Sequence, residues 1–422
     1  MHGQDFCRHG HQCIDRTSSN PTTSHQHCFM KHSLTFQFHE LPGWLILLFV
    51  FTFPFSTHIA SFFSMALLVV FLLSGEWEAK WEAFKASRVL HLCVALFAWT
   101  VFAGVYAEAN PDFLMKDLFK YKKLLLAIPV FFFLNAGLKS KMLMAYVAAE
   151  FFSIALSLYK GHGLVHFFRT GEFKYSENFR IYIVEGMHIA LVLFILLKYF
   201  VERQHQRWML GGLIVILMTH AVFLNGRMAL LSFLISVTYF IFWRLKTFAH
   251  QSAALTGLAL AALLAYQSMP LIEKRVDRTI AEASEVFIPG SPESTRLQFF
   301  QISWSLFKAS PVIGMGPGAF HTVTSSLPDK DGEFVNLLHT HNEYLTLLSQ
   351  YGLIGLSLFL LLIFFSLKEA RHSPLSPYKH VAYLGMVLFL VNSLTDSMLY
   401  MEGFFFVFLL ACAFTPKHAR AP

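Results

Sequence analysis

The sequence contains few charged residues for its length. Lys, Arg, Asp and Glu together make up 14% of the 422 residues, whereas soluble domains carry about 25%. Cysteine is also scarce, and three of the five cysteines lie within the first 28 residues. These shortages argue against an ordinary soluble domain and give no sign of an extracellular disulfide framework.

Two functional signatures are missing as well. The chain has no G-x-x-x-x-G-K-[S/T] loop, which argues against direct use of ATP. Basic and aromatic residues do not cluster as they do in nucleic-acid-binding proteins, so we expect no nucleic-acid partner. The net charge of +7 is spread over many loops, and we interpret it as membrane topology combined with anion binding.

Hydrophobic residues are abundant, at 55% of the chain with 47 phenylalanines. Apolar runs recur from Leu41 almost to the C-terminus, and many approach the roughly 20 residues that a helix needs to cross a bilayer. They lack the alternation typical of membrane β-barrels. The sequence therefore predicts an all-α, polytopic membrane helix bundle of about twelve transmembrane helices. The predicted spans are 42–55, 57–74, 89–107, 120–137, 141–158, 181–200, 207–224, 227–244, 250–267, 342–366, 379–396 and 399–415.

These spans divide the chain into four regions. Residues 1–40 are predicted to be a disordered cytoplasmic tail, and Met30 is an alternative true start. The cysteines and histidines of the tail match no zinc-finger spacing, and no apolar stretch in it marks a signal peptide. Residues 41–267 hold helices one to nine, 268–341 form a long loop, and 342–416 hold helices ten to twelve.

Short loops rich in Lys and Arg alternate with short loops that have none. By the positive-inside rule, the basic loops and both termini are cytoplasmic, which puts the loop 268–341 outside the cytoplasm. Within this loop, an apolar stripe of Leu297, Phe300, Trp304 and Phe307 predicts an amphipathic helix over 294–309. We expect it to lie along the membrane surface or to pack on the bundle.

The most informative segment, HTHNEYLTLLSQYGLIG, runs from His339 to Gly355. Thr340 and Glu343 have the spacing of a capping box, which predicts that they start the tenth membrane helix with His341 in its first turn. At 1.5 Å per residue, Gly352 is expected about 16 Å deeper, and Gly352 and Gly355 are expected to permit close helix packing. A neutral His341 imidazole can accept a proton from a sugar hydroxyl. An interfacial histidine that only forms hydrogen bonds is the alternative.

His341–Asn342, nine residues and then Gly352-x-x-Gly355 resemble the H-[NSQ]-x9-G-x-x-G signature of the O-antigen ligase and polymerase superfamily. Two further blocks are similar to that family. One contains Arg296, Trp304, Pro311 and the Gly314–Gly318 turn, and the other is Asn225–Gly226–Arg227. Together they cover roughly residues 225–356.

The resemblance implies roles for these residues. His341 would be the catalytic base, with Asn342 beside it, and Arg227 and Arg296 would hold the pyrophosphate of a lipid-linked donor. Arg180 is a weaker candidate for the same task, and a topological charge is its alternative. The alternative for Arg227 is a side chain that only snorkels to the outer membrane interface. Asp396 would orient His341 or bind acceptor sugar, unless it only forms hydrogen bonds at a helix end.

The implied activity is that of an O-antigen ligase, which transfers polysaccharide from undecaprenyl pyrophosphate to lipid A–core at the periplasmic face. The transfer would be inverting and metal-independent, and no cofactor is expected, because the donor carries its own activated leaving group. The expected partners are this donor, the lipid A–core acceptor and membrane lipid. An O-antigen polymerase, a protein O-oligosaccharyltransferase and a membrane transporter remain as alternatives.

Overall fold

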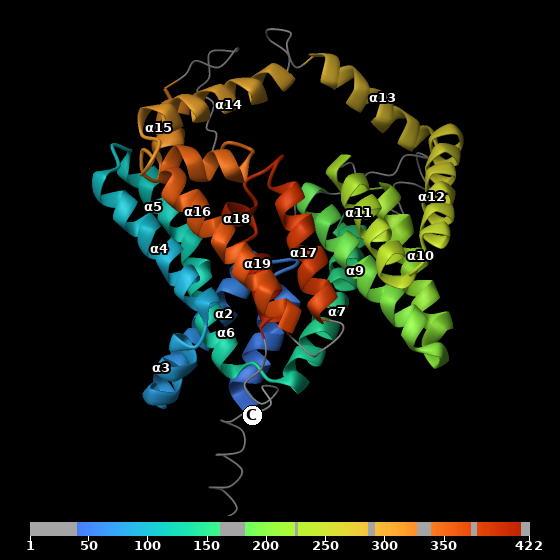
Figure 1. The fold of residues 1–422 in the computed structure, drawn as a ribbon, viewed down its shortest axis with the longest axis horizontal. Helices are drawn as coiled ribbons and strands as arrows, with labels where there is room; N and C mark the ends of the chain where they lie inside the picture. Colours follow the sequence, from blue (N-terminus) through green and yellow to red (C-terminus); the bar gives the residue numbers. More distant parts are fainter. Residues whose placement is uncertain are drawn as a thin grey trace, which may run out of the picture. The chain divides into compact units, whose positions relative to one another are not determined.

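The computed structural model describes residues 40–160, 182–223, 227–285, 292–326, 339–372 and 378–414. Every regular element in these ranges is a helix (Figure 1), which confirms the predicted all-α class. The chain separates into two compact units, Met1–Pro42 and Gly43–Pro422. The predicted tail lies almost wholly outside the described residues, and the description below concerns the second unit.

The described residues form the following helices in chain order. A first apolar helix, Glu40–Thr52, precedes the labelled ones. These are α2 (Thr57–Leu73), α3 (Trp77–Lys85), α4 (Arg88–Tyr106), α5 (Pro111–Tyr121), η1 (Lys122–Leu126), α6 (Ala127–Phe133), α7 (Ala136–Lys160), α9 (Tyr182–Glu202), η2 (Gln204–Gln206) and α10 (Arg207–Phe223). The second half contains α11 (Arg227–Arg244), α12 (Phe248–Ser268), α13 (Pro270–Glu285), α14 (Pro292–Ala309), α15 (Ala319–Thr324), α16 (Glu343–His372), α17 (Tyr378–Asn392), α18 (Met398–Met401) and α19 (Gly403–Ala413).

Four of the described helices are long and apolar enough to cross a membrane, namely α4, α9, α12 and α16. The pair α2 and α3, bent by 114°, counts as a fifth span if the two helices are taken together. The predicted number of twelve is therefore not confirmed. Two predicted spans are interrupted: 120–137 runs from the end of α5 through η1 and α6 to the start of α7, and 399–415 covers α18 and α19.

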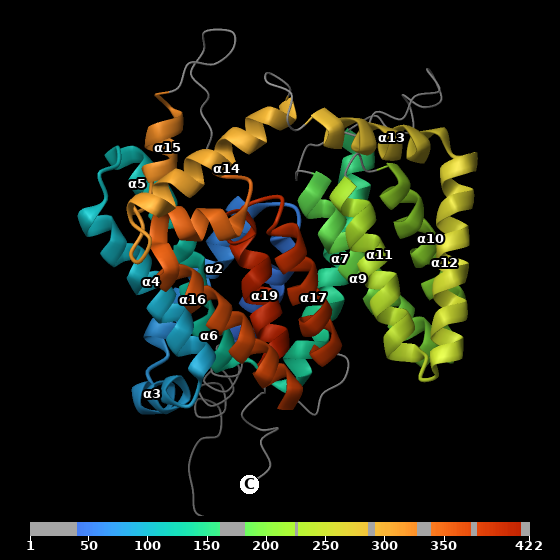
Figure 2. The same ribbon diagram turned by 45° about the horizontal axis from the view of Figure 1, so that its top comes forward.

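The core of the unit is centred on α19. All eleven of its residues are buried, as expected for a helix that is apolar on every side. It contacts α17, α16 and α6, and Figure 2 shows it between α16 and α17. By contrast, no residue of α12 is buried. An apolar helix without protein neighbours on most sides suits contact with lipid.

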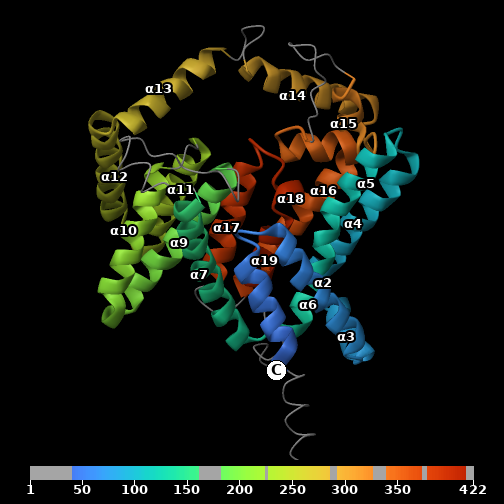
Figure 3. The same ribbon diagram turned by 180° about the vertical axis from the view of Figure 1, so that it is seen from behind.

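In the part of the region 268–341 that the structure describes there are three helices, α13, α14 and α15. Figures 1 and 3 show α13 running from the end of α12 towards α14. The predicted amphipathic helix is observed as α14, which contacts α16. Its buried side is formed by Phe299 and Ser303, whereas Trp304 of the predicted stripe is 48% exposed. The packing face is therefore rotated away from the stripe that hydropathy alone indicates.

The helix α16 is broken at Gly352, which has φ 64° and ψ −165°. This backbone conformation is essentially restricted to glycine. Figure 1 shows the first part of α16 lying across one end of the bundle and the second part descending through it. The continuous helix predicted from the sequence is therefore wrong, because α16 changes direction at Gly352.

The break leaves backbone groups of α16 without helical hydrogen-bond partners. The turn that follows α14 supplies the missing partners. The amides of Met315 and Gly316 donate to the carbonyls of Ser349 and Gln350 at 2.9 and 2.8 Å. In the opposite direction, the amide of Leu353 donates to the carbonyl of Pro311 at 2.9 Å. Buried polar backbone groups need such partners, most of all within a membrane. The turn 311–316 and the break in α16 therefore form one interlocked element.

Candidate functional site

The functional candidate His341 lies two residues before the start of α16, not within its first turn. It has a positive φ of 53°, which is uncommon for a residue other than glycine. The helix begins at Glu343, and Asn342 caps it, because the Asn342 Oδ1 atom accepts the Leu345 amide at 2.9 Å. The predicted capping box of Thr340 and Glu343 is therefore wrong.

The Glu343 carboxylate serves a different contact. It is fully buried, and its Oε2 atom accepts the amides of Leu399 and Tyr400 at 2.9 and 3.4 Å. The Glu343 amide donates to the carbonyl of Ser393 at 2.9 Å, and the Asn342 side chain donates to that of Leu394 at 3.0 Å. These bonds attach the start of α16 to the segment 393–400 and so hold Asp396 beside the preceding histidines.

Asp396 lies between two histidines. Its Oδ1 atom is 3.3 Å from Nδ1 of His339 and 3.4 Å from Nδ1 of His341. The side chains of Asp396 and His339 are only 2% and 13% exposed, whereas that of His341 is 31% exposed. The Ser397 amide also donates to the carboxylate, at 2.8 Å. His341 is thus the imidazole of this cluster that a substrate can reach.

Burial and neighbouring charges give His339 and Asp396 different protonation states. Burial lowers the pKa of His339 to about 4, and the Asp396 carboxylate only partly opposes this. Burial alone would raise the pKa of Asp396, but contact with the two imidazoles and the Ser397 amide outweighs burial and lowers it. At neutral pH the cluster therefore contains an ionised carboxylate and a neutral His339.

One wall of the site comes from α14. The Phe299 ring lies 6.1 Å from the His341 ring, centroid to centroid, with an interplanar angle of 24°. Arg296 lies one turn before Phe299 in the same helix. Arg227 is the first residue of α11, and Arg180 lies outside the described residues. The structure therefore brings His341, Asn342 and Asp396 together, and the phosphate-binding role of the three arginines stays a prediction.

The two glycines of the motif act differently from the predicted helix contact. A Cβ atom on Gly352 would lie 2.3 Å from the Val312 carbonyl oxygen, so this glycine admits the turn 311–316 rather than a helix. A Cβ atom on Gly355 would lie 2.3 Å from Cβ of Tyr351 and 3.6 Å from the Trp99 ring of α4. Only Gly355 faces a neighbouring helix as predicted.

The same cluster has the composition of a metal site. One ligand atom each from His339, His341 and Asp396 lies within 4.8 Å of the others, and such N and O donors suit zinc. The sequence prediction that no metal is involved stays a prediction. The sequence also contains an Asp-x-Asp pair, Asp329 and Asp331, whose carboxylates are of the kind that bind metal ions. Both residues lie outside the described residues.

Reasoning from the sequence missed two neighbours of the site. His339 shares Asp396 with His341, and its ring lies 4.4 Å from the His341 ring, centroid to centroid. The Tyr400 ring lies 5.8 Å from the His339 ring. The His-x-His spacing was a usable signal for His339, whereas nothing local in the sequence indicates that Tyr400 returns to this place.

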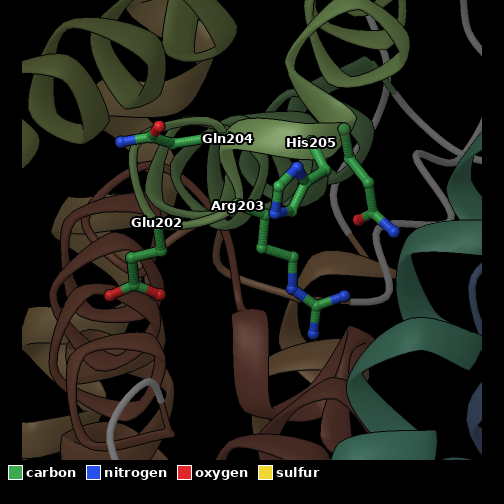
Figure 4. Close-up of a pocket in the computed structure, with 5 residues that line it drawn as sticks. Glu202, Arg203, Gln204 and His205 are labelled. Carbon is green, nitrogen blue, oxygen red and sulfur yellow. The ribbon is translucent and has the colours of Figure 1, made fainter.

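A hollow of about 430 Å³ lies elsewhere, at the turn between α9 and α10. Five consecutive residues line it, from Glu202 to Gln206. Figure 4 shows Arg203 and His205 together on one side of the turn and Glu202 on the other. Because one exposed turn supplies the whole lining, this hollow lacks the convergent groups of a substrate site.

Residues 212–360 match the family model described as O-Antigen ligase. The matched range contains Arg227, Arg296 and His341, while Asp396 follows it. No curated protein matches the chain significantly. The family match confirms the resemblance seen in the sequence, and it assigns residues 212–360 of this membrane-helix protein to the O-antigen ligase/polymerase superfamily.

Proposed function

We propose that the protein is an O-antigen ligase of the bacterial inner membrane. It transfers O-antigen polysaccharide from undecaprenyl pyrophosphate to the lipid A–core oligosaccharide at the periplasmic face. The observation that carries this proposal is the pairing of His341 with the buried Asp396, 3.4 Å apart, at the start of α16 within the family match. A second class of activity, polymerisation of the same lipid-linked glycan, is separated from ligation by the experiment below.

The pairing suggests how His341 acts. Because Nδ1 of His341 faces the Asp396 carboxylate, the proton of a neutral ring is held on Nδ1 and the lone pair remains on Nε2. Nε2 is then free to accept the proton of an acceptor hydroxyl. Asp396 also stabilises the imidazolium that forms during transfer.

The bond changes balance without a further reactant. The acceptor oxygen loses its proton to His341 and forms a bond to the anomeric carbon of the reducing-end sugar. The bond between that carbon and the pyrophosphate oxygen breaks, and its electron pair leaves with undecaprenyl pyrophosphate. Arg227 and Arg296 would neutralise the departing anion, because guanidinium groups bind phosphate oxygens in a bidentate manner. One direct displacement inverts the anomeric centre.

The experiment deletes the gene and complements it with wild type, His341→Ala or His205→Ala. Lipopolysaccharide and lipid-linked glycan are then compared on gels. We expect the deletion and His341→Ala strains to make lipid A–core without O-antigen, while polymer accumulates on undecaprenyl pyrophosphate. His205, which lies in the exposed turn before α10, is the matched control and should restore the wild-type pattern.

The other outcomes reject the proposal in different ways. Lipid A–core capped by a single repeat would indicate a polymerase. An unchanged lipopolysaccharide pattern would exclude both activities and direct attention to glycoproteins or transport. Immunoblotting of membranes confirms that each variant is inserted at the wild-type level.

A further inference from the structure

Lys120 lies beside the histidine cluster, although α5, which carries it, precedes the family match by some ninety residues. The helix α5 packs on α18, and the Lys120 Nζ atom lies 4.8 Å from the centroid of the Tyr400 ring. The Tyr400 ring also lies near His339, with 5.8 Å between the two ring centroids. One tyrosine ring therefore connects the ammonium group to the candidate site.

The Lys120 ammonium has no acceptor of its own. In the part of the chain that the structure describes, it donates no hydrogen bond and forms no ion pair within 4.0 Å, although the side chain is only partly exposed. Asp117 and Glu402 act on it only as more distant charges. The neighbouring Lys123 differs, because its Nζ atom donates to the Met401 carbonyl at 3.4 Å. Three unused donors in a partly desolvated place favour an anionic ligand.

The charge of Lys120 reaches the candidate site. It contributes to the lowered pKa of His339, behind the larger effect of burial. The groups that face Lys120 from the packed elements are Asp117 on its own helix, Glu402 and Tyr400 from the region of α18, and the two histidines beyond Tyr400. The two carboxylates leave the ammonium itself unpaired, so it remains able to attract a substrate anion towards His341.

We infer that Lys120 is a further anion-binding residue of this site and that its ammonium takes a phosphate group of a substrate. The inference rests on the proposed function and extends it to the first half of the chain. A lysine ammonium acts as a point charge on phosphate oxygens, which would complement the two guanidinium groups. The phosphate belongs either to the pyrophosphate of the donor or to the phosphorylated acceptor.

The experiment uses the full-length protein in maltoside micelles, with Lys120→Gln, Lys120→Arg and Lys116→Gln. Lys116 is the matched control, because it lies one turn earlier on α5, is exposed, and also places its Nζ atom over a ring, 5.7 Å from the Phe113 centroid. KM is measured for the donor and for the acceptor separately. Binding of inorganic pyrophosphate is measured by calorimetry, and thermal unfolding reports whether each variant is folded.

We expect Lys120→Gln to raise one KM by on the order of tenfold, the effect of losing a charged hydrogen bond, while Lys120→Arg and Lys116→Gln remain near wild type. A rise in the KM for the donor, accompanied by weaker pyrophosphate binding, would show that Lys120 binds the donor phosphate. A rise for the acceptor alone assigns the acceptor phosphate.

Three results would overturn the inference. These are wild-type KM values in Lys120→Gln, a lower unfolding temperature without any KM change, and a Lys120→Arg variant as defective as Lys120→Gln. Failure of the proposed function is distinguishable, because the wild-type protein would then transfer no glycan. In that case the binding of inorganic pyrophosphate and of the phosphorylated acceptor is compared between Lys120→Gln and Lys116→Gln, and equal affinities of the two variants for both ligands reject the inference.

Discussion

The amide of Gly316 donates to the carbonyl of Gln350 at 2.8 Å, and this bond between residues more than thirty positions apart joins two sequence motifs. One motif contains the turn after α14, and the other contains His341 and Gly352. The bond replaces the helical partner that Gln350 loses at the break in α16. The same contact holds α14, with Phe299 against His341, on the first part of α16.

Replacing Gly352 with Ala should destabilise the protein. The added Cβ atom would lie 2.3 Å from the Val312 carbonyl oxygen, and the φ of 64° disfavours any side chain. Such backbone strain alone costs about 1–3 kcal/mol. The measurement is the unfolding temperature in detergent. Gly257→Ala in α12 is the control, because no atom lies within 4 Å of its added Cβ, and equal unfolding temperatures for the two variants would contradict the prediction.

Replacing Asp396 with Asn should reduce kcat with little change in substrate KM. The amide cannot hold the Nδ1 proton of His341 as the carboxylate does, and it cannot stabilise an imidazolium. We expect a loss on the order of 10²–10⁴ in kcat, the range for general-base and triad residues. Thr395→Ala, at the adjacent position outside the histidine contact, should behave as wild type. A kcat within twofold of wild type for Asp396→Asn would show that His341 does not depend on this carboxylate.

Lowering the pH should destabilise the protein through His339. Its pKa falls from 6.5 to about 4 in the folded protein, so the unfolded chain binds more protons between these values. The free energy of unfolding therefore decreases as the pH falls through this window and is unaffected by His339 above it. Asp117 has the opposite influence, because burial raises its pKa to about 6.

Comparing the pH dependence of unfolding between wild type and His339→Gln isolates the contribution of His339, because both proteins contain Asp117. We expect the unfolding temperature of wild type, relative to that of the variant, to fall between pH 7 and pH 5. Parallel pH profiles for the two proteins would contradict this expectation.

Metal ions should inhibit rather than support transfer. The proposed mechanism uses Nε2 of His341 as a base, whereas a zinc ion bound by His339, His341 and Asp396 would occupy the imidazoles and neutralise the carboxylate. We expect full activity in EDTA and inhibition by micromolar Zn²⁺ that His339→Ala weakens. Loss of activity in EDTA, restored by a divalent ion, would instead identify a metal-dependent enzyme.

Many features of the fold follow from the sequence alone. The apolar runs predicted helices at 57–74, 207–224 and 227–244, and α2, α10 and α11 end within one residue of these limits. The motif around His341 also indicated the superfamily that the family match supports. Such inferences succeed because chain-local hydropathy and short motifs are properties of neighbouring residues.

The tertiary structure decided the arrangement of the site. Asp396 reaches both His339 and His341 because bonds between the start of α16 and the segment 393–400 bring them together. Gly352 breaks α16 because the turn 311–316 supplies the missing backbone partners, and α14 presents Phe299 rather than the predicted stripe. Each of these outcomes depends on contacts between residues distant in sequence, whose energies no local pattern contains.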